Sequence, residues 1–499
     1  MRYLYLSNAG ISDTIPQWFE SISSHISYMD LSYNQIGGSL PRFDGYSSNL
    51  EARYLILNTN KFEGSFASFP ANVKVLDLSD NLLSGLVPHT DETMNPRLES
   101  VNLSKNRFTG SFPVHFCKIL SLGVLDLSHN KFSGGLPGCL GNLNYLRVLD
   151  LTNNTLTGTI PKSLGNLKDL WSLHLANNIF VGYLPESLQS LIGLVTMDLG
   201  NNLFDGSIPL WIGEKLLNLR ILNMQSNKFT GKIPLQLCQL NTLQHLNLAH
   251  NKIFGTIPLC FKNLSGMIMD EEDIYNSGTG NYEENILAST KGIQLMYTTT
   301  LQYLTSLDLS SNNISGEIPD VLMDLVGLKN LNLSRNLLQG QIPTKIGNLK
   351  KIESLDLSLN SLSGPIPPTL TNLNFLSALN LSFNNLSGAI PVGNQIQTLD
   401  DPSIYEGNNG LCGPPVSRRC KENDATDVVG DDKGHDDTPD LWFYIGMGSG
   451  FVVGTMGLIG SLYFTITWRV AYFNILESVY DWFMVSILLT FGRLRREFF

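Results

Sequence analysis

Apolar and polar residues alternate in short runs that recur along most of the chain. In the run LRVLDLTNN at 146–154, Leu149 and Leu151 flank the polar Asp150. This alternation predicts a short β-strand whose leucines point into a core and whose Asp150 points out onto a sheet. Asn154 follows where the chain turns away, and an amide at this place can bond backbone groups that the turn leaves open. Each run therefore predicts one strand that ends in an asparagine-stabilised turn.

The same run, written LxxLxLxxN, returns with a period close to 24 residues. Fifteen matches occur, and eight of their fourteen intervals equal 24. No single unit can bury its apolar face alone, so stability must come from stacking. The signature is that of a leucine-rich-repeat solenoid of short parallel strands. The matched asparagines are Asn8, Asn34, Asn60, Asn81, Asn106, Asn130, Asn154, Asn178, Asn202, Asn227, Asn251, Asn312, Asn336, Asn360 and Asn384.

The second half of each unit predicts an irregular or 3-10 return segment. LTGTIPKSLGNL at 156–167 and LSGPIPPTLTNL at 362–373 share the pattern LxGxIPxxLxxL. Gly158 permits tight backbone geometry, and Pro161 fixes φ and favours an extended predecessor. The pattern resembles the plant extracellular subclass of leucine-rich repeats over about residues 1–391. This resemblance implies a twisted superhelix with a second small sheet.

Fifteen strands about 4.8 Å apart would give a spine of roughly 70 Å. Such a long concave surface suits an extracellular peptide, protein or glycan. No nucleophile–base set or metal cluster stands out, so we expect no enzyme, cofactor or metal site. Exposed Trp and Arg are typical interface anchors, although outward residues can also be merely solvated. The candidate contacts at outward positions are Trp171, His174, Arg220, Gln225 and His245.

Composition supports a folded chain and excludes one class of partner. Charged residues make up 15% of the 499 residues, hydrophobic ones 42%, and the formal net charge is −11. No basic stripe is present to meet phosphates, which argues against a nucleic-acid partner.

The cysteines fall at repeated offsets. Two of them follow ladder asparagines by eleven and nine residues, and a second pair repeats both offsets. The offsets predict disulfides and an oxidising compartment, with free buried thiols as the alternative. No spacing suggests zinc. The predicted bonds are Cys117–Cys139 and Cys238–Cys260 on the convex side, and Cys412–Cys420 at the end of the array.

Seven N-x-S/T sequons predict glycosylation. Some of these sequons arise simply because the repeat consensus contains the residues N-L-S. Asn102, Asn332 and Asn380 occupy the outward strand position, where glycans would block part of the concave face. The full set is Asn102, Asn153, Asn263, Asn313, Asn332, Asn380 and Asn385.

One interval, from Asn251 to Asn312, has 61 residues and interrupts the array. The surplus at 265–301 begins acidic and polar, and TKGIQLMYTTTL near its end has the character of a strand or hairpin arm. A long insertion in a compact array is usually functional or disordered. The predicted order is therefore eleven repeats (1–264), this island (265–301), four repeats (302–391) and a cysteine cap (392–420).

The C-terminal region predicts a membrane anchor. An acidic spacer at 421–440 precedes 441–467, which has 27 residues without a charge. As a helix this segment would span about 40 Å, enough to cross a bilayer with tilt. Arginines in the short tail at 468–499 place the C-terminus in the cytosol. A small-residue stripe predicts helix–helix packing and comprises Gly446, Gly450, Gly454 and Gly457.

This order of segments resembles the plant leucine-rich-repeat receptor-like proteins. GFVVGTMGLIGSLYF and WRVAYFNILESVYDWF near the C-terminus, and SNAGISDTIPQWF at 7–19, resemble that family closely. The resemblance implies a non-catalytic, single-pass plasma-membrane receptor that detects an extracellular, often microbial, molecule. It implies signalling through adaptor and co-receptor receptor kinases. Lys291 and Tyr297 match the family's Lys-x5-Tyr island motif, which implies a role in ligand and co-receptor binding.

Alternatives remain at this stage. The island could be a structural plug, with Lys291 solvated and Tyr297 packed on the next repeat. The protein could be a developmental peptide co-receptor of the same architecture, or a non-signalling inhibitor-type binding protein. Because Met1 lies inside a repeat, without a signal peptide or N-terminal cap, we expect a truncated gene product or an incomplete gene model.

Overall fold

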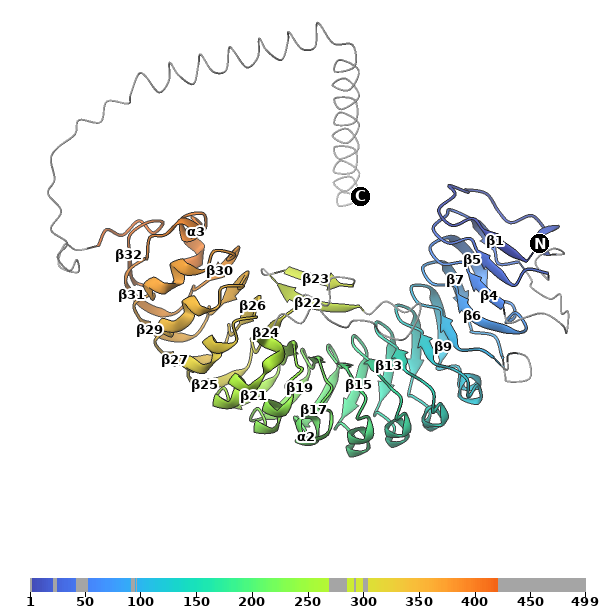
Figure 1. Cartoon of the computed structure of the whole chain (residues 1–499), viewed down its shortest axis with the longest axis horizontal. Helices are drawn as coiled ribbons and strands as arrows, with labels where there is room; N and C mark the ends of the chain where they lie inside the picture. Colours follow the sequence, from blue (N-terminus) through green and yellow to red (C-terminus); the bar gives the residue numbers. More distant parts are fainter. Residues whose placement is uncertain are drawn as a thin grey trace, which may run out of the picture. The chain divides into compact units, whose positions relative to one another are not determined.

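The computed structural model describes residues 2–20, 25–41, 53–90, 95, 97–268, 285–290, 293–298 and 304–420. These residues lie in one compact unit, Met1–Asp424. Its repeats stack along a curve (Figure 1), and each repeat adds one strand to each of two parallel sheets. The predicted solenoid of parallel strands is confirmed.

The first sheet has 15 parallel strands and lines the inner side of the curve. In β12 the middle residue, Leu149, is fully buried, and its neighbours Val148 and Asp150 face the inner surface. The strands are β1 (Tyr3–Tyr5), β2 (Tyr28–Asp30), β4 (Arg53–Ile56), β6 (Val73–Asp77), β8 (Ser100–Asn102), β10 (Val124–Asp126), β12 (Val148–Asp150), β14 (Ser172–His174), β16 (Thr196–Asp198), β18 (Ile221–Asn223), β20 (His245–Asn247), β24 (Ser306–Asp308), β26 (Asn330–Asn332), β28 (Ser354–Asp356) and β30 (Ala378–Asn380).

The ladder asparagines join neighbouring repeats. The Asn154 amide donates to the carbonyls of Leu127 at 3.0 Å and Leu151 at 3.1 Å. Its oxygen accepts from the Phe132 backbone N–H at 2.9 Å. One side chain therefore satisfies backbone groups in its own repeat and in the preceding one, as the sequence predicted.

The first and last ladder positions differ from the sequence-based count. Because Tyr3 pairs with Tyr28, the residue equivalent to Asn34 is Ala9 and not Asn8. Asn8 instead adopts a left-handed conformation with φ of 52°. At the other end, Asn408 completes the ladder with a 2.9 Å bond to the Leu381 carbonyl. The pattern LxxLxLxxN is absent around both sites, so counting it placed the first position one residue early and missed the last.

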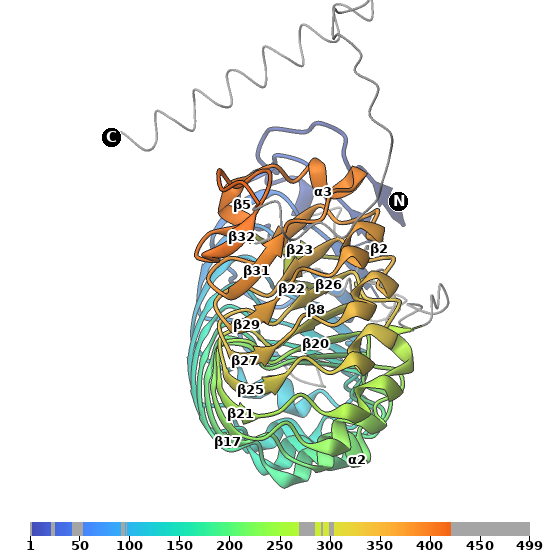
Figure 2. The ribbon, with the colours of Figure 1, turned by 90° about the vertical axis from the view of Figure 1, so that its left-hand side faces the viewer.

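The second sheet runs along one side of the array (Figure 2) and also has 15 strands. Gly158 ends β13 with φ of 82°, a conformation that favours glycine. Its strands are β3 (Gly37–Ser39), β5 (Lys61–Ser65), β7 (Leu82–Gly85), β9 (Arg107–Ser111), β11 (Lys131–Gly134), β13 (Thr155–Gly158), β15 (Ile179–Gly182), β17 (Leu203–Ser207), β19 (Lys228–Gly231), β21 (Lys252–Gly255), β25 (Asn313–Glu317), β27 (Leu337–Gly340), β29 (Ser361–Gly364), β31 (Asn385–Ala389) and β32 (Gly410–Cys412).

Short helices carry the chain back along the outer side of the curve (Figure 1). Pro161 immediately precedes η3 in an extended conformation, so the IP dipeptide opens the helix as predicted. The helices of the array are η1 (Val114–Lys118), η2 (Gly138–Asn142), η3 (Lys162–Asn166), η4 (Glu186–Ser190), α2 (Trp211–Lys215), η5 (Leu235–Gln239), η6 (Leu259–Asn263), η7 (Ser265–Met267), η9 (Asp320–Asp324), η10 (Thr344–Asn348) and η11 (Pro368–Asn372).

A continuous core runs between these layers. Leucines from every layer form one buried cluster along the array. Phenylalanines stack within it, with ring centroids 6.1 Å apart for Phe180–Phe204 and 6.4 Å apart for Phe204–Phe229. Each repeat therefore packs mainly on its neighbours, as expected for a solenoid.

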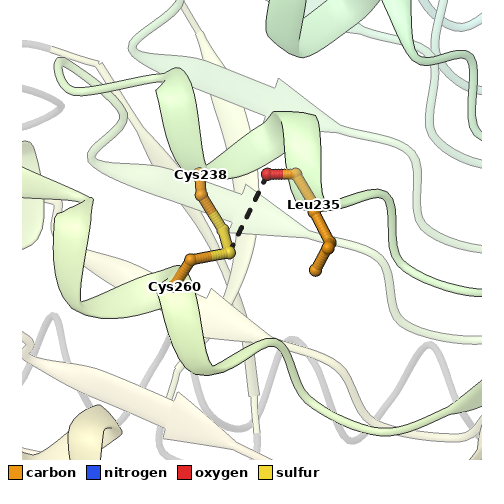
Figure 3. Close-up of a disulfide and its surroundings, with 3 residues drawn as sticks. All are labelled: Leu235, Cys238 and Cys260. Atoms are coloured by element: carbon orange, nitrogen blue, oxygen red, sulfur yellow. Dashed lines mark hydrogen bonds between the residues drawn. A yellow bond between two sulfur atoms is a disulfide. The ribbon is translucent and has the colours of Figure 1, made fainter.

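All three predicted disulfides form. Cys117 in η1 joins Cys139 in η2, and Cys238 in η5 joins Cys260 in η6, with Cα atoms 5.6 and 5.7 Å apart. Figure 3 shows the second bond bridging two adjacent helices on the outer side, beside the Leu235 carbonyl. The third bond, Cys412–Cys420, lies in the cap, which also contains α3 (Asn394–Gln397) and η12 (Pro402–Tyr405).

The insertion contains a two-stranded antiparallel hairpin, β22 (Ile286–Thr290) and β23 (Ile293–Tyr297). The strand predicted near its end corresponds to β23. The start of the insertion differs from the prediction, because Met267 is fully buried in the array's core. The Met267 carbonyl also accepts from the Gly327 N–H of the following repeats at 2.9 Å. Ser265–Met267 therefore still packs as part of the solenoid.

Several predictions concern segments outside the described residues. These are Lys291, the acidic spacer at 421–440, the apolar segment at 441–467 with its glycine stripe, and the tail at 468–499. None of the helices in the described part of the chain has the length and apolar character that a membrane crossing requires.

Candidate functional site

A groove of about 460 Å³ lies on the inner sheet. Strand residues from Asp77 of β6 to Asn223 of β18 line it, and Tyr33, Asn58 and Thr59 extend it to the turns after β2 and β4. Its lining comes from the third strand position and from the turn that follows each strand, as in Asp150 and Thr152. Seven neighbouring strands spaced about 4.8 Å apart extend over roughly 29 Å. The groove is therefore elongated, and it exists only because the repeats stack.

The hairpin closes one end of this groove. Asn285 and Thr298, at the base of β22 and β23, line it together with the repeats. Ile286 is fully buried against Ile221 of β18, and Tyr297 packs on the same apolar cluster. Figure 1 shows the hairpin on the inner side of the curve. The insertion is therefore docked on the inner sheet and forms part of the site.

Acidic side chains dominate the charge of the groove. Its lining contains five aspartates and one lysine, Lys105. Asp126 and Asp150 are direct neighbours in the strand register and are 6% and 5% exposed. Each also stabilises its own turn, since Asp126 accepts the Ser128 N–H and Asp150 the Thr152 N–H, both at 2.9 Å. The groove therefore offers buried carboxylates that are already held in place.

Burial and mutual repulsion change the ionisation of these acids. The pKa of Asp126 rises to about 7, first because of burial and second because of the Asp150 charge. Burial also raises the pKa of Asp77. Burial acts oppositely on a base, so it lowers the pKa of His129 in the same groove. Near neutral pH the groove thus has an uncharged histidine and an Asp126 that readily takes up a proton.

Beside the groove, Ser172, His174 and Asp198 come together in a hydrolase-like order. The Ser172 hydroxyl lies 2.7 Å from His174 Nε2, and His174 Nδ1 lies 3.9 Å from Asp198 Oδ2. Ser172 has no exposed surface, and Asp198 also accepts from Asn223 at 2.9 Å. The hydroxyl is therefore not accessible to a substrate in this arrangement. We conclude that this set is a structural polar chain, which sequence inspection had overlooked.

Comparisons with known proteins place these features in a family. Leucine rich repeat models match residues 71–132 and 96–156, and again 218–240, 242–264, 303–325, 327–349 and 351–373. Receptor-like protein EIX2 of Solanum lycopersicum is 44% identical over 508 residues, covering 99% of this chain and 47% of that protein. This chain is a plant leucine-rich-repeat receptor-like protein. Receptor-like protein EIX1 of the same plant is 47% identical over 310 residues, covering 58% and 30%.

The receptor-like protein spans about half or less of the length of these curated relatives. Among solved structures, the ectodomain of the Arabidopsis receptor kinase HAESA with an IDA peptide hormone gives a TM-score of 0.64 at 31% identity, covering 85% of this chain and 64% of that one. The GASSHO1/SCHENGEN3 ectodomain with CASPARIAN STRIP INTEGRITY FACTOR 2 gives 0.62 at 28%, covering 84% and 51%. The fold therefore occurs in ectodomains that bind peptides.

The structure distributes the predicted contact residues over different environments. Gln225 lines the groove and accepts the Asn247 amide at 2.8 Å. Trp171 and Arg220 precede strands β14 and β18 and are half-buried at the sheet edge. His174 and His245 are each 1% exposed, because the strands crowd together on the inner face. Only Gln225 of these five thus contributes to the groove wall.

The predicted glycosylation sites fall into two groups. The oxygens of Asn102, Asn332 and Asn380 accept from serines two residues later, and these side chains are half-buried. Asn153 is also half-buried, and its amide contacts His129 at 2.8 Å. The exposed sites lie away from the inner sheet, at Asn263, Asn313 and Asn385.

The acidic lining of the groove was the main feature that sequence reasoning missed. The alternation at 146–154 predicted that Asp150 points outward, but the same position in the neighbouring repeats was not compared. Reading the third strand position across successive repeats gives Asp77, Asn102, Asp126 and Asp150. That column of residues is visible in the sequence once the register is known, so it could have revealed the acidic row.

Proposed function

We propose that this receptor-like protein is a non-catalytic cell-surface receptor for an extracellular peptide or protein segment. The ligand segment would lie in the groove between β6 and β18, against the docked hairpin. Binding would change the association with partner receptor kinases and so signal defence. This chain covers less than half of each curated relative, so the activity of those whole proteins is not carried over to it. The proposal rests instead on the groove.

The groove is the observation that carries the proposal. A span of roughly 29 Å accommodates about eight or nine residues of extended peptide. Its walls present amides, hydroxyls and carboxylates, which can bond the main chain of such a segment. The hairpin fixes where the segment would end. A surface of this length suits an extended chain better than a compact metabolite.

Partner kinases are proposed from the family resemblance. Tyr297 is packed on the apolar cluster at the hairpin base. This motif residue could therefore act by holding the island in position on the repeats. Lys291 lies outside the described residues and stays a proposal. The predicted membrane helix, with the C-terminus in the cytosol, would bring a kinase-bearing partner alongside.

Filling the groove tests the function. Thr152→Arg would place a long side chain in the middle of the groove, while the Thr152 N–H keeps its bond to Asp150. Thr344→Arg makes the same change at an exposed site in η10 on the outer side. Full-length variants would be expressed in plant cells and challenged with microbial extracts, and co-purifying receptor kinases measured. We expect Thr152→Arg to abolish ligand-dependent co-purification and Thr344→Arg to retain it. Equal responses from both variants would refute a groove ligand.

A developmental peptide receptor is the second candidate. The HAESA and GASSHO1/SCHENGEN3 ectodomains were solved with IDA and CASPARIAN STRIP INTEGRITY FACTOR 2. Challenging the same cells with endogenous plant peptides separates the two candidates. A response to those peptides and not to microbial extracts would replace defence with development and leave the groove in place.

A further inference from the structure

The hairpin β22–β23 rests on the inner sheet through a small apolar cluster. Ile286 and Tyr297 are cross-strand partners in the hairpin, and both pack against Ile221 together with Leu304. An isolated two-stranded hairpin is only marginally stable in water. Contacts with the sheet must therefore supply much of its stability, and whatever weakens them would free the hairpin.

His245 lies directly beside this cluster. In the strand register it stands between Ile221 of β18 and Ser306 of β24, and Leu304 lies two residues before Ser306. His245 is 1% exposed, and neither of its ring nitrogens has a hydrogen-bond partner among the described residues. A neutral imidazole can tolerate such a place at some cost, whereas an imidazolium would be a buried, uncompensated charge.

The charged groups nearby offer little compensation. Burial is the main cause that lowers the pKa of His245 to about 4, and Asp198 opposes it only in part. Asp198 is engaged by an amide at 2.9 Å, and Asp308 accepts a backbone N–H at 3.0 Å. Among the described residues, five titratable or charged groups belong to the elements packed around His245 or flank them. These are His174, Asp198, Arg220, Asp308 and Tyr297.

We propose that protonation of His245 releases the hairpin β22–β23 from the inner sheet. The hairpin rests on the inner sheet while the ring is neutral and leaves it when acid protonates the ring. Asn285 and Thr298 line the groove, so release of the hairpin would open that end of the groove. The device is independent of which ligand the groove takes.

The direction of the pH effect follows from the two states of the ring. The docked ring has a pKa of about 4, against 6.5 for a solvated one. Docking is therefore fully favourable above pH 6.5 and weakens as the pH falls from 6.5 toward 4. Between pH 7.5 and 5.0 the docking equilibrium should weaken about 30-fold, since each unit below 6.5 contributes up to tenfold.

Hydrogen exchange of the full-length protein tests this release. Exchange of 285–298 would be measured at pH 7.5 and 5.0 and corrected for the intrinsic effect of pH. We expect the wild-type hairpin to lose about 30-fold protection at pH 5.0, while β20 and β24 stay protected. His245→Ile, which places the residue type of Ile221 next to it, should show equal hairpin protection at both pH values.

Two matched variants make the result decisive. His250→Asn changes an exposed histidine in the turn that follows β20. His250 has a left-handed backbone conformation, and several other repeats carry asparagine at this position, so the variant should behave as wild type. His245→Thr uses the residue type of Thr196 at the same strand position, in case isoleucine disturbs the sheet. The proposal is wrong if wild-type protection does not change with pH, or if the change persists without His245. Joint loss of protection in β20, β24 and the hairpin would also overturn it.

Discussion

At the residue scale, the side-chain amide of each ladder asparagine forms hydrogen bonds with several backbone groups. Asn154 donates to the carbonyls of Leu127, Leu151 and Thr152, and accepts from Phe132. Such groups would otherwise be buried without partners, because the turn takes the backbone out of both sheets. This is why asparagine at this place marks the repeat so clearly in the sequence.

Replacing Asn154 by Ala should therefore destabilise the array by roughly 2–4 kcal/mol, since it leaves several buried groups unsatisfied. Asn144→Ala, at an exposed position at the end of the preceding repeat, should change stability by less than about 0.5 kcal/mol. Urea unfolding followed by circular dichroism compares the two variants. Similar midpoints would show that water or relaxation replaces the ladder bonds.

Asp126 should make stability depend on pH. Its folded-state pKa of about 7 lies above the ordinary 3.8, so the folded protein holds the proton more tightly than the unfolded chain does. Stability should accordingly fall as the pH rises from about 4 to about 7. Asp126→Asn keeps the acceptor for the Ser128 N–H, as Asn102 does for Ser104 in β8. This variant should raise the unfolding temperature at pH 8 by a few degrees and leave it unchanged at pH 4.

The control for this experiment is Asp356→Asn, the same change at the same strand position in β28, outside the groove. It should not reproduce the pH-dependent gain. If Asp126→Asn lowers the unfolding temperature at pH 8, the carboxylate is stabilised in the fold by contacts that outweigh its burial.

At the element scale, the hairpin is the part whose position depends on remote residues. Its strand character is local and was visible in TKGIQLMYTTTL. Its docking depends on Ile221, which lies more than sixty residues before β22. Because an apolar contact has no sequence signature of its own, only the folded chain shows where the hairpin rests.

Tyr297→Ala should loosen the hairpin at pH 7.5, because it removes a half-buried ring from the cluster. The expected loss is roughly 1–2 kcal/mol, part of the value of a fully buried aromatic ring. Tyr297→Phe keeps the ring and should retain protection. Hydrogen exchange of 285–298 reports both. If the alanine variant stays as protected as wild type, Tyr297 has no part in docking, and its role in the motif would be contact with a partner.

At the scale of the whole molecule, the repeats and the C-terminal segments have separate tasks in the proposed receptor. The repeats build the groove, and residues 441–467 would anchor the protein. Replacing Gly446, Gly450 and Gly454 by Leu should weaken co-purification of a kinase partner while leaving the protein at the cell surface, because bulky side chains prevent close helix approach. A Leu458→Ala variant of the same segment serves as a control. Undiminished co-purification would remove the glycine stripe from the proposal.

Most of the architecture could be predicted because each repeat interacts mainly with its neighbours. A periodic pattern of Leu, Asn, Gly and Pro then specifies strand, turn and return segment in every unit. The repeated cysteine offsets predicted two of the disulfides for the same reason, since the same two positions in adjacent units meet on the outer side. The third, Cys412–Cys420, was predicted from its place at the end of the array. The exceptions, Ala9 and Asn408, occur at the first and last ladder positions, where the motif is incomplete.

The sequence by itself determined the solenoid and the two disulfides between neighbouring repeats, because those features follow from local periodicity. Its motifs also resemble a known family, and that resemblance implied the second sheet. Only the tertiary structure decided that Asp126 and Asp150 share a groove, that the hairpin closes its end, and that His245 is buried beside the hairpin's base. These features depend on strand register and curvature, which bring together residues from many repeats. They also depend on a docked insertion, whose apolar contact with Ile221 no spacing in the chain records.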